Sequence, residues 1–475
     1  MRFIATIIAV ALSVTVQASA MVSDDQLQSF LAKEMASANV PGVSYGLVEN
    51  GETSSGVAGV VDAEATEPVS EETAFIIGSV SKSFTALAVM QMVEAGQVDL
   101  DAPIGAYLDV FDGNPQAAAV TIRQLLSHTS GYSTHQGNQS QADYTRREDA
   151  LEMRVKDIGA MTLAYAPGTA WDYSNANYML AGRLIEVVSG QSYDDYVNQN
   201  VLRPAGMAHS FVGSGNLDPR LAKPHEPWLF SRRVIRTEKF GRGSAPQGGI
   251  ASTGGDLAIY MALMMNGEDD LISADSKALM MQPASEASPN YGLGWFVDQE
   301  AGKVWHTGLS PGYEALAVMK PKENRAAVIL SNAASGTGTG ELYYLHNGFA
   351  EQAIGVEYNS ARSGFWPKMV YLGFMLAPLA FLAAMIWAWT KRAGIRAKSG
   401  AMGLISLWMP LVTTGALAFV VFYVLPHMIG APISAIRAFQ PDFAFGLVAT
   451  GVTGVAWALF RLGIGYTGRS APSPA

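Results

Sequence analysis

Three long apolar stretches near the end of the chain constrain its architecture more than any other feature of the sequence. They cover residues 369–390, 402–425 and 443–462. A helix needs ~20 apolar residues to cross the ~30 Å hydrocarbon core of a bilayer, and each stretch is that long. Pro378 and Pro410 lie inside two of them, which membrane helices tolerate because neighbouring groups satisfy the freed carbonyls. We therefore predict three transmembrane helices, with buried helices of a soluble core as the alternative.

The charges between these stretches predict the orientation of the chain. The first connection carries Lys391, Arg392, Arg396 and Lys398, whereas the second carries only Arg437. Loops rich in lysine and arginine stay in the cytoplasm, so the region before the first stretch is expected on the opposite side. The prediction is a multi-pass protein in contact with the lipid of a bacterial inner membrane, with its folded domain in the periplasm.

The first residues of the chain predict the same destination. Residues 1–20 contain Arg2, an apolar run from Phe3 to Val16, and Ala18-Ser19-Ala20 with small residues at the cleavage-defining positions. This pattern is typical of a secretory signal peptide, and the apolar run is short for a membrane span. An uncleaved anchor helix is the alternative.

Composition excludes several kinds of chemistry. The chain has no cysteine, which rules out a disulfide, a thiolate nucleophile and a Cys-ligated zinc. Its net charge of −10 disfavours nucleic acid as a partner, because phosphate binding needs clustered lysine and arginine. The seven histidines form no paired motif such as H-E-x-x-H, so neither a metal nor another cofactor is expected. A nucleophile must then be an oxygen or an amine.

Residues 21–358 are predicted to form one globular domain, since no linker, repeat or low-complexity tract divides them. Short β-rich runs stand at its two ends, at residues 41–49, 304–320 and 325–331, and helical patterns fill the middle. Residues 79–95 carry an apolar face and stop at Gly96, and Thr121-Ile122-Arg123-Gln124 has the form of a capping box. This order favours an antiparallel sheet whose first and last strands are neighbours, flanked by helices. The predicted fold class is therefore α+β.

The first chemically informative motif is Ser79-Val80-Ser81-Lys82, at the start of the predicted helix. Three residues of separation put the hydroxyl of Ser79 and the amine of Lys82 on one helical face. A desolvated lysine can lose its proton and then accept the proton of a serine, which makes the serine a nucleophile. The alternative is an ordinary helix N-cap with a solvated lysine.

A second motif, Tyr173-Ser174-Asn175, follows the turn Pro167-Gly168 and precedes a helical run. A tyrosine near a lysine can exchange protons with the reacting groups, and an asparagine can bind a substrate amide. A packed aromatic beside a turn asparagine is the alternative.

A third motif, His306-Thr307-Gly308, lies in a strand predicted over residues 303–309. A strand beside the serine could pair with an extended substrate. Its Leu309 N–H could complete an oxyanion hole with the N–H of Ser79. The alternative is a histidine satisfied on a strand edge.

Together these motifs resemble the class C β-lactamase and penicillin-binding-protein superfamily of serine hydrolases. The resemblance rests on residues 75–82, 125–131, 167–168, 173–175, 248–253 and 306–308, and it covers nearly all of residues 25–355. It implies the β-lactamase/transpeptidase-like sheet, a small-molecule or peptidic substrate, and an acyl-enzyme. It also implies that Ser79 is the acylated residue, that Lys82 and Tyr173 transfer its proton, and that Asn175 and the 306–309 strand contact the substrate.

One departure bears on the substrate. Many β-lactamases of this superfamily have lysine where this chain has His306, and histidine is mostly uncharged near neutral pH. We therefore expect a peptidase of the D-amino-acid or DD-peptidase kind, or an esterase. A β-lactamase and a catalytically silent receptor are the alternatives. The three terminal spans also resemble the layout of the colibactin-maturation type of periplasmic peptidase.

Overall fold

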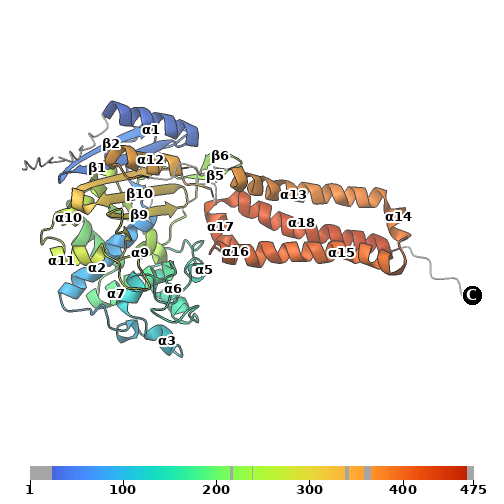
Figure 1. Ribbon diagram of the computed structural model, residues 1–475, viewed down its shortest axis with the longest axis horizontal. Helices are drawn as coiled ribbons and strands as arrows, with labels where there is room; N and C mark the ends of the chain where they lie inside the picture. Colours follow the sequence, from blue (N-terminus) through green and yellow to red (C-terminus); the bar gives the residue numbers. More distant parts are fainter. Residues whose placement is uncertain (1–23, 214–217, 238, 337–341, 358–364, 468–475) are drawn as a thin grey trace, which may run out of the picture.

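The computed structural model describes residues 24–213, 218–237, 239–336, 342–357 and 365–467. Figure 1 shows a globular α/β domain at one end and a long bundle of helices that extends from it. The predicted signal peptide at residues 1–20 lies outside the described residues, and so does the predicted domain boundary at residue 358.

A six-stranded antiparallel sheet forms the centre of the described part of the domain, in the order β2-β1-β11-β10-β9-β8. The strands are β1 (Gly42–Glu49), β2 (Glu52–Gly59), β8 (Phe296–Asp298), β9 (Lys303–Ser310), β10 (Tyr313–Lys320) and β11 (Arg325–Ser331). Strands β1 and β11 pair directly, with Val43 opposite Ser331. The prediction that strands from the two ends of the domain are neighbours is confirmed.

Helices cover both faces of this sheet. On one face, α1 (Asp24–Ala38) and α12 (Tyr343–Ile354) pack on each other over a smaller apolar core. On the other face, α2 (Ser81–Glu94) and α10 (Gly254–Met265) bury the larger core. The smaller sheet elements are β3 (Phe75–Ile76), β4 (Phe211–Val212), β7 (Ile250–Ser252) and the hairpin of β5 (His225–Trp228) with β6 (Ser231–Val234).

A helical lobe completes the domain beside α2 (Figure 1). Its helices are α3 (Pro115–Ala118), α4 (Ile122–Leu126), α5 (Thr134–Gly137), α6 (Ala150–Gly159), α7 (Asn175–Ser189), α8 (Tyr193–Val197), α9 (Ala245–Gly248) and α11 (Ala274–Met280). The predicted capping box is confirmed, because the Thr121 side chain accepts from the Gln124 N–H and the Gln124 side chain bonds back to the Thr121 N–H. The fold is α+β, as predicted.

The bundle contains three helices that are long and apolar enough to span a membrane, among the residues described. They are α13 (Phe365–Thr390), then α15 (Gly400–Phe419) continued through α16 (Leu425–Met428), and α18 (Pro441–Tyr466). Helices α13 and α15 both pack on α18. The short basic helix α14 (Arg392–Arg396) lies at the end of the bundle farthest from the domain, whereas α17 (Ile433–Phe439) lies next to the domain (Figure 1).

Several polar contacts join the bundle to the domain. The buried carboxylate of Asp442, at the start of α18, accepts hydrogen bonds from the Leu229 N–H (2.7 Å) and from the Tyr371 hydroxyl. The Lys239 amine donates to the Ala438 carbonyl at 2.8 Å. These bonds fix the connection between α16 and α18 against the domain.

Candidate active site

The hydroxyl of Ser79 stands in a tight turn at the end of a buried strand. The turn is a single 3-10 turn over Gly78–Val80, which runs directly into α2. The sequence pattern predicted that the α-helix starts at Ser79, whereas the α-helix begins at Ser81 and Ser79 lies in the 3-10 turn before it. The N–H of Ile77, just before the turn, donates to the Ile250 carbonyl at 2.9 Å, which anchors the turn to β7.

The side chain of Lys82 lies fully buried beside this hydroxyl. Its Nζ is 3.0 Å from Ser79 Oγ, 2.8 Å from Asn175 Oδ1 and 2.7 Å from the Gln247 carbonyl. Burial lowers the pKa of Lys82 well below the ordinary lysine value. An uncharged amine has two N–H donors, which suffice for Asn175 and Gln247. Its lone pair is then left to accept the proton of Ser79.

The phenol of Tyr173 lies on the other side of the serine. Burial raises its pKa, and a hydrogen bond with Ser79 opposes that rise. The ring is 4.9 Å from the Lys82 Nζ. The lowered pKa of Lys82 favours the unprotonated amine, which can accept a proton. The raised pKa of Tyr173 keeps its phenol protonated, so that it has a proton to give.

His128 packs against Tyr173 from behind, with ring centroids 4.3 Å apart. Its Nδ1 is 3.1 Å from both the Ser174 N–H and the Asn177 amide, and its carbonyl accepts from the Asp172 N–H at 3.0 Å. These bonds hold the loop that carries Tyr173.

Two glycines let strand β9 pass directly beside Ser79. A Cβ on Gly308 would lie 1.8 Å from the Ile77 carbonyl oxygen and 3.3 Å from the Ser79 nitrogen. A Cβ on Gly78, which has a φ of +53°, would lie 2.5 Å from the Leu309 nitrogen. Only glycine fits at these contacts. The backbone nitrogens of Ser79 and Leu309 are therefore brought to the same rim, where two N–H groups can stabilise an oxyanion.

The side chain of His306 is buried on the same face of β9 as Gly308, the face turned toward the Ser79 turn, and its ring centroid is 6.1 Å from that of Tyr173. Its Nε2 is 3.0 Å from the Tyr291 hydroxyl and its Nδ1 is 2.6 Å from the Thr307 carbonyl. Burial lowers the pKa of His306 to about 3, so the ring is neutral. Within β9, Thr307 and Leu309 instead face the cleft. His306 thus lies close to Tyr173, but its ring nitrogens are engaged by Tyr291 and Thr307 and it does not line the cleft.

Asn175 was expected to contact a substrate, but its side chain is bonded to protein groups. Its Oδ1 accepts from Lys82, and its Nδ2 donates to Asn138 Oδ1 at 2.8 Å. The side chain borders the cleft, but both of its polar atoms are already engaged by protein groups. It holds the lysine in place.

Ser79 opens into a cleft of about 640 Å³. Domain residues of the helical lobe and of β9 and β10 form most of its walls. The remaining wall comes from the connection between α16 and α18, through Ile429, Ala431, Ala435, Ile436 and Phe439. Sequence reasoning missed these residues as well as Asn138 and Gln247. Residues 433–439 alternate apolar side chains with Ser434 and Arg437, and nothing in the sequence placed this segment in the cleft.

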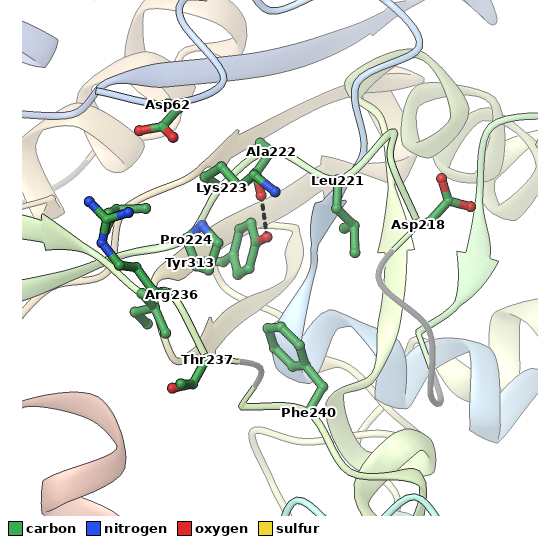
Figure 2. A pocket seen from close by; sticks show the side chains of 12 residues that line it. Asp62, Asp218, Leu221, Ala222, Lys223, Pro224, Arg236, Thr237, Phe240 and Tyr313 are labelled. Atoms are coloured by element: carbon green, nitrogen blue, oxygen red, sulfur yellow. Dashed lines mark hydrogen bonds between the residues drawn. The ribbon is translucent and has the colours of Figure 1, made fainter. Parts of the chain in front are cut away.

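A smaller cavity of about 230 Å³ adjoins the cleft and shares Phe240 with it. Figure 2 shows its lining, in which the Tyr313 hydroxyl donates to the Ala222 carbonyl and the side chains of Asp62, Asp218 and Arg236 stand around the rim. Its described lining holds no serine–lysine pair. Across the described residues, no group of histidines and carboxylates is arranged to hold a metal ion.

Comparison with known proteins places the chain among relatives of the β-lactamases. Residues 27–347 match the family described as Beta-lactamase. Protein flp of Staphylococcus aureus (strain MRSA252) is 26% identical over 420 residues, which cover 86% of this chain and 83% of that protein.

Two solved structures illustrate the similarity of fold. The octameric penicillin-binding protein homologue from Pyrococcus abyssi has a TM-score of 0.59 and 25% identity, covering 68% of this chain and 76% of that one. The D-amino acid amidase from Ochrobactrum anthropi SV3, solved with D-phenylalanine, has a TM-score of 0.57 and 26% identity, covering 69% of this chain and 96% of that one.

Proposed function

This chain belongs to the beta-lactamase family of serine hydrolases, and we propose that it cleaves amide or ester substrates with Ser79 as the nucleophile. The observation that carries the proposal is the 3.0 Å contact between Ser79 Oγ and a buried lysine amine. A lysine removed from water is a base of the strength that a serine hydroxyl requires.

The proposed acylation step follows from this arrangement. Lys82 accepts the proton of the Ser79 hydroxyl while the oxygen attacks the substrate carbonyl carbon. The N–H groups of Ser79 and Leu309 stabilise the oxyanion of the tetrahedral intermediate. As the intermediate collapses, Tyr173 gives its proton to the leaving amine or alcohol and takes one back from Lys82. The leaving group departs, and an ester on Ser79 remains.

Deacylation uses the same groups with water in place of the serine. The Tyr173–Lys82 pair accepts a proton from water as its oxygen attacks the ester carbonyl. The proton then passes to Ser79 Oγ, which leaves as a hydroxyl. The product acid is released and the resting site is restored.

The charges around the cleft favour an amide or ester over a penicillin-like substrate. Among the described lining residues, Lys239 is the one lysine or arginine, and its amine is engaged by Glu226 and the Ala438 carbonyl. His306 is neutral and does not line the cleft, whereas Glu314 does. A substrate carboxylate would find no free cation among these residues. β-Lactam hydrolysis therefore remains the second candidate.

We further propose that the amide or peptide is one of a D-amino acid. The support is the similarity to the D-amino acid amidase, whose chain is almost completely covered by the alignment.

The proposed location is the periplasmic face of a bacterial inner membrane, with residues 1–20 as the signal peptide. The basic connection around α14 and the folded domain lie at opposite ends of the apolar bundle (Figure 1). This arrangement is the one that the positive-inside rule favours for an outward domain.

A labelling experiment tests the nucleophile. Purified full-length protein in lipid nanodiscs should react with a fluorescent fluorophosphonate, and Ser79→Ala should abolish the reaction. Ser54→Ala, at an exposed position of β2, is the matched control and should react like the natural protein. Equal labelling of the Ser79→Ala variant would refute the proposal. Faster turnover of a chromogenic cephalosporin than of D-phenylalanine amide would favour the second candidate.

The orientation can be tested because the chain contains no cysteine. In intact spheroplasts, a membrane-impermeant maleimide should label Ser54→Cys in the domain but not Lys398→Cys in the basic connection. The reverse labelling pattern would overturn the proposed location.

A further inference from the structure

The catalytic cleft is not closed by the domain alone. Five of its lining residues belong to the connection between the second and third apolar helices, at residues 429–439. All five are apolar: Ile429, Ala431, Ala435, Ile436 and Phe439. The wall opposite the domain is therefore part of the membrane-associated region.

This wall is firmly placed. The Gly430 carbonyl accepts from the Asn138 side chain at 2.8 Å, and the ring of His427 stacks on His135 at 4.2 Å. Ile436 is buried among the apolar side chains that join α17 to the three helices. The apolar surface of the cleft thus runs without interruption into the packing of the bundle.

The same wall lies at the level where the bundle leaves the domain. Apolar side chains that face outward collect there, with Phe230 60% exposed at the β5–β6 turn, Trp366 72% exposed at the start of α13 and Met428 77% exposed at the end of α16. Exposed aromatic and apolar groups at the ends of apolar helices are typical of the membrane surface. Ile429 is 38% exposed at this level and also lines the cleft. Ile429 therefore lines the cleft at the end of the apolar bundle that meets the domain (Figure 1).

We propose that the substrate is amphiphilic: it carries an apolar tail that lies along residues 429–439 while the scissile amide or ester reaches Ser79. This inference rests on the proposed hydrolase function and adds the substrate class. A short polar substrate would leave these apolar side chains against water, whereas a hydrocarbon tail would bury them and itself leave water. A tail that partitions into the outer leaflet arrives at the level of Ile429.

Chain-length dependence of hydrolysis tests this proposal. Full-length protein in nanodiscs would be assayed with two ester series, one from acetyl to octanoyl on the acyl side and one from methyl to octyl on the alcohol side. In one of the series, kcat/KM should rise on the order of 100-fold from the shortest to the longest member. The series that responds identifies the side of the scissile bond that carries the tail. Neither series responding would overturn the proposal.

Variants separate cleft binding from simple partition into lipid. Ile429→Gln and Phe439→Gln should each lower the long-to-short ratio of kcat/KM at least ~5-fold. Met428→Gln is the matched control, because this neighbour is exposed and does not line the cleft, and its ratio should equal that of the natural protein. An equal ratio in all three variants would assign the chain-length effect to the bilayer and overturn the proposal.

The outcome also distinguishes this inference from the proposed function. If fluorophosphonate fails to label Ser79 and no ester is cleaved, the hydrolase assignment fails. If labelling and short-ester cleavage are present without chain-length preference, only the tail site fails.

Discussion

The side chain of Asn138 links Lys82, through Asn175, to Gly430 in the connection between the second and third apolar helices. Its Nδ2 donates to the Gly430 carbonyl at 2.8 Å, and its Oδ1 accepts from Asn175 Nδ2 at 2.8 Å. Asn175 in turn accepts from Lys82, whose amine contacts Ser79. A continuous path of hydrogen bonds therefore runs from Ser79 to the connection between the second and third apolar helices.

Asn138→Ala is expected to slow acylation of Ser79 about tenfold. The substitution removes both hydrogen bonds, and each is worth about 1 kcal/mol. Asn175 then loses the partner that orients it towards Lys82. The rate of fluorophosphonate labelling measures the effect, and kcat should fall more than KM rises for a short ester.

Asn200→Ala, which removes a side-chain hydrogen bond to the Tyr196 carbonyl far from the cleft, is the control and should label at the natural rate. A merely structural role of Asn138 would instead lower the yield of folded protein and leave the labelling rate per folded molecule unchanged.

Lys82 determines the expected pH dependence. The amine must be unprotonated to act as a base, and burial lowers its pKa below the ordinary lysine value of 10.5. The labelling rate should therefore rise with pH and reach its plateau well below 10.5, and activity should be lost as pH falls through the pKa of Lys82. Lys82→Arg stays protonated and should cost ~10²–10⁴ in rate. A rate that rises only near the ordinary lysine value would contradict the assignment.

Tyr173→Phe should distinguish proton removal from Ser79, which Lys82 performs, from proton donation to the leaving group, which Tyr173 performs. The variant keeps the ring between His128 and Lys82 but has no proton to give to the leaving group. Amides need that proton more than activated esters do, because an amine is the poorer leaving group. We expect kcat/KM to fall ~10²-fold or more for a D-amino acid anilide and much less for a p-nitrophenyl ester. Equal losses on both substrates would instead assign Tyr173 a role in removing the proton from Ser79, together with Lys82.

Gly308→Ala should damage the oxyanion hole while the domain remains folded. The added Cβ would lie 1.8 Å from the Ile77 carbonyl oxygen, so β9 must move away from the turn that carries Ser79. Loss of one oxyanion donor costs ~10²–10³ in kcat. Gly415→Ala, in α15 with no atom near the new Cβ, is the control. A natural kcat in Gly308→Ala would place the oxyanion elsewhere.

Much of the scaffold followed from local patterns. The strands over 304–320 and 325–331 were predicted because apolar runs alternate with turn residues, and the capping box at Thr121 because its two bonds span three residues. The neighbouring positions of β1 and β11 also agreed with prediction, since strands at both ends of a domain favour such a pairing. The Ser79-x-x-Lys82 spacing placed two groups together because three residues make about one turn.

The sequence by itself thus determined the α+β fold, the three long apolar helices and the proximity of Ser79 to Lys82, because each depends on periodicity or length over a few residues. Tertiary structure alone decided the rest. It buried His306 against Tyr291, bonded Asn175 to Lys82, and placed Ile429 and Phe439 in the wall of the cleft that Ser79 also lines. The physical reason is that burial, and with it the pKa of Lys82, arises from packing against segments 93 and 165 residues farther along the chain, which no local pattern records.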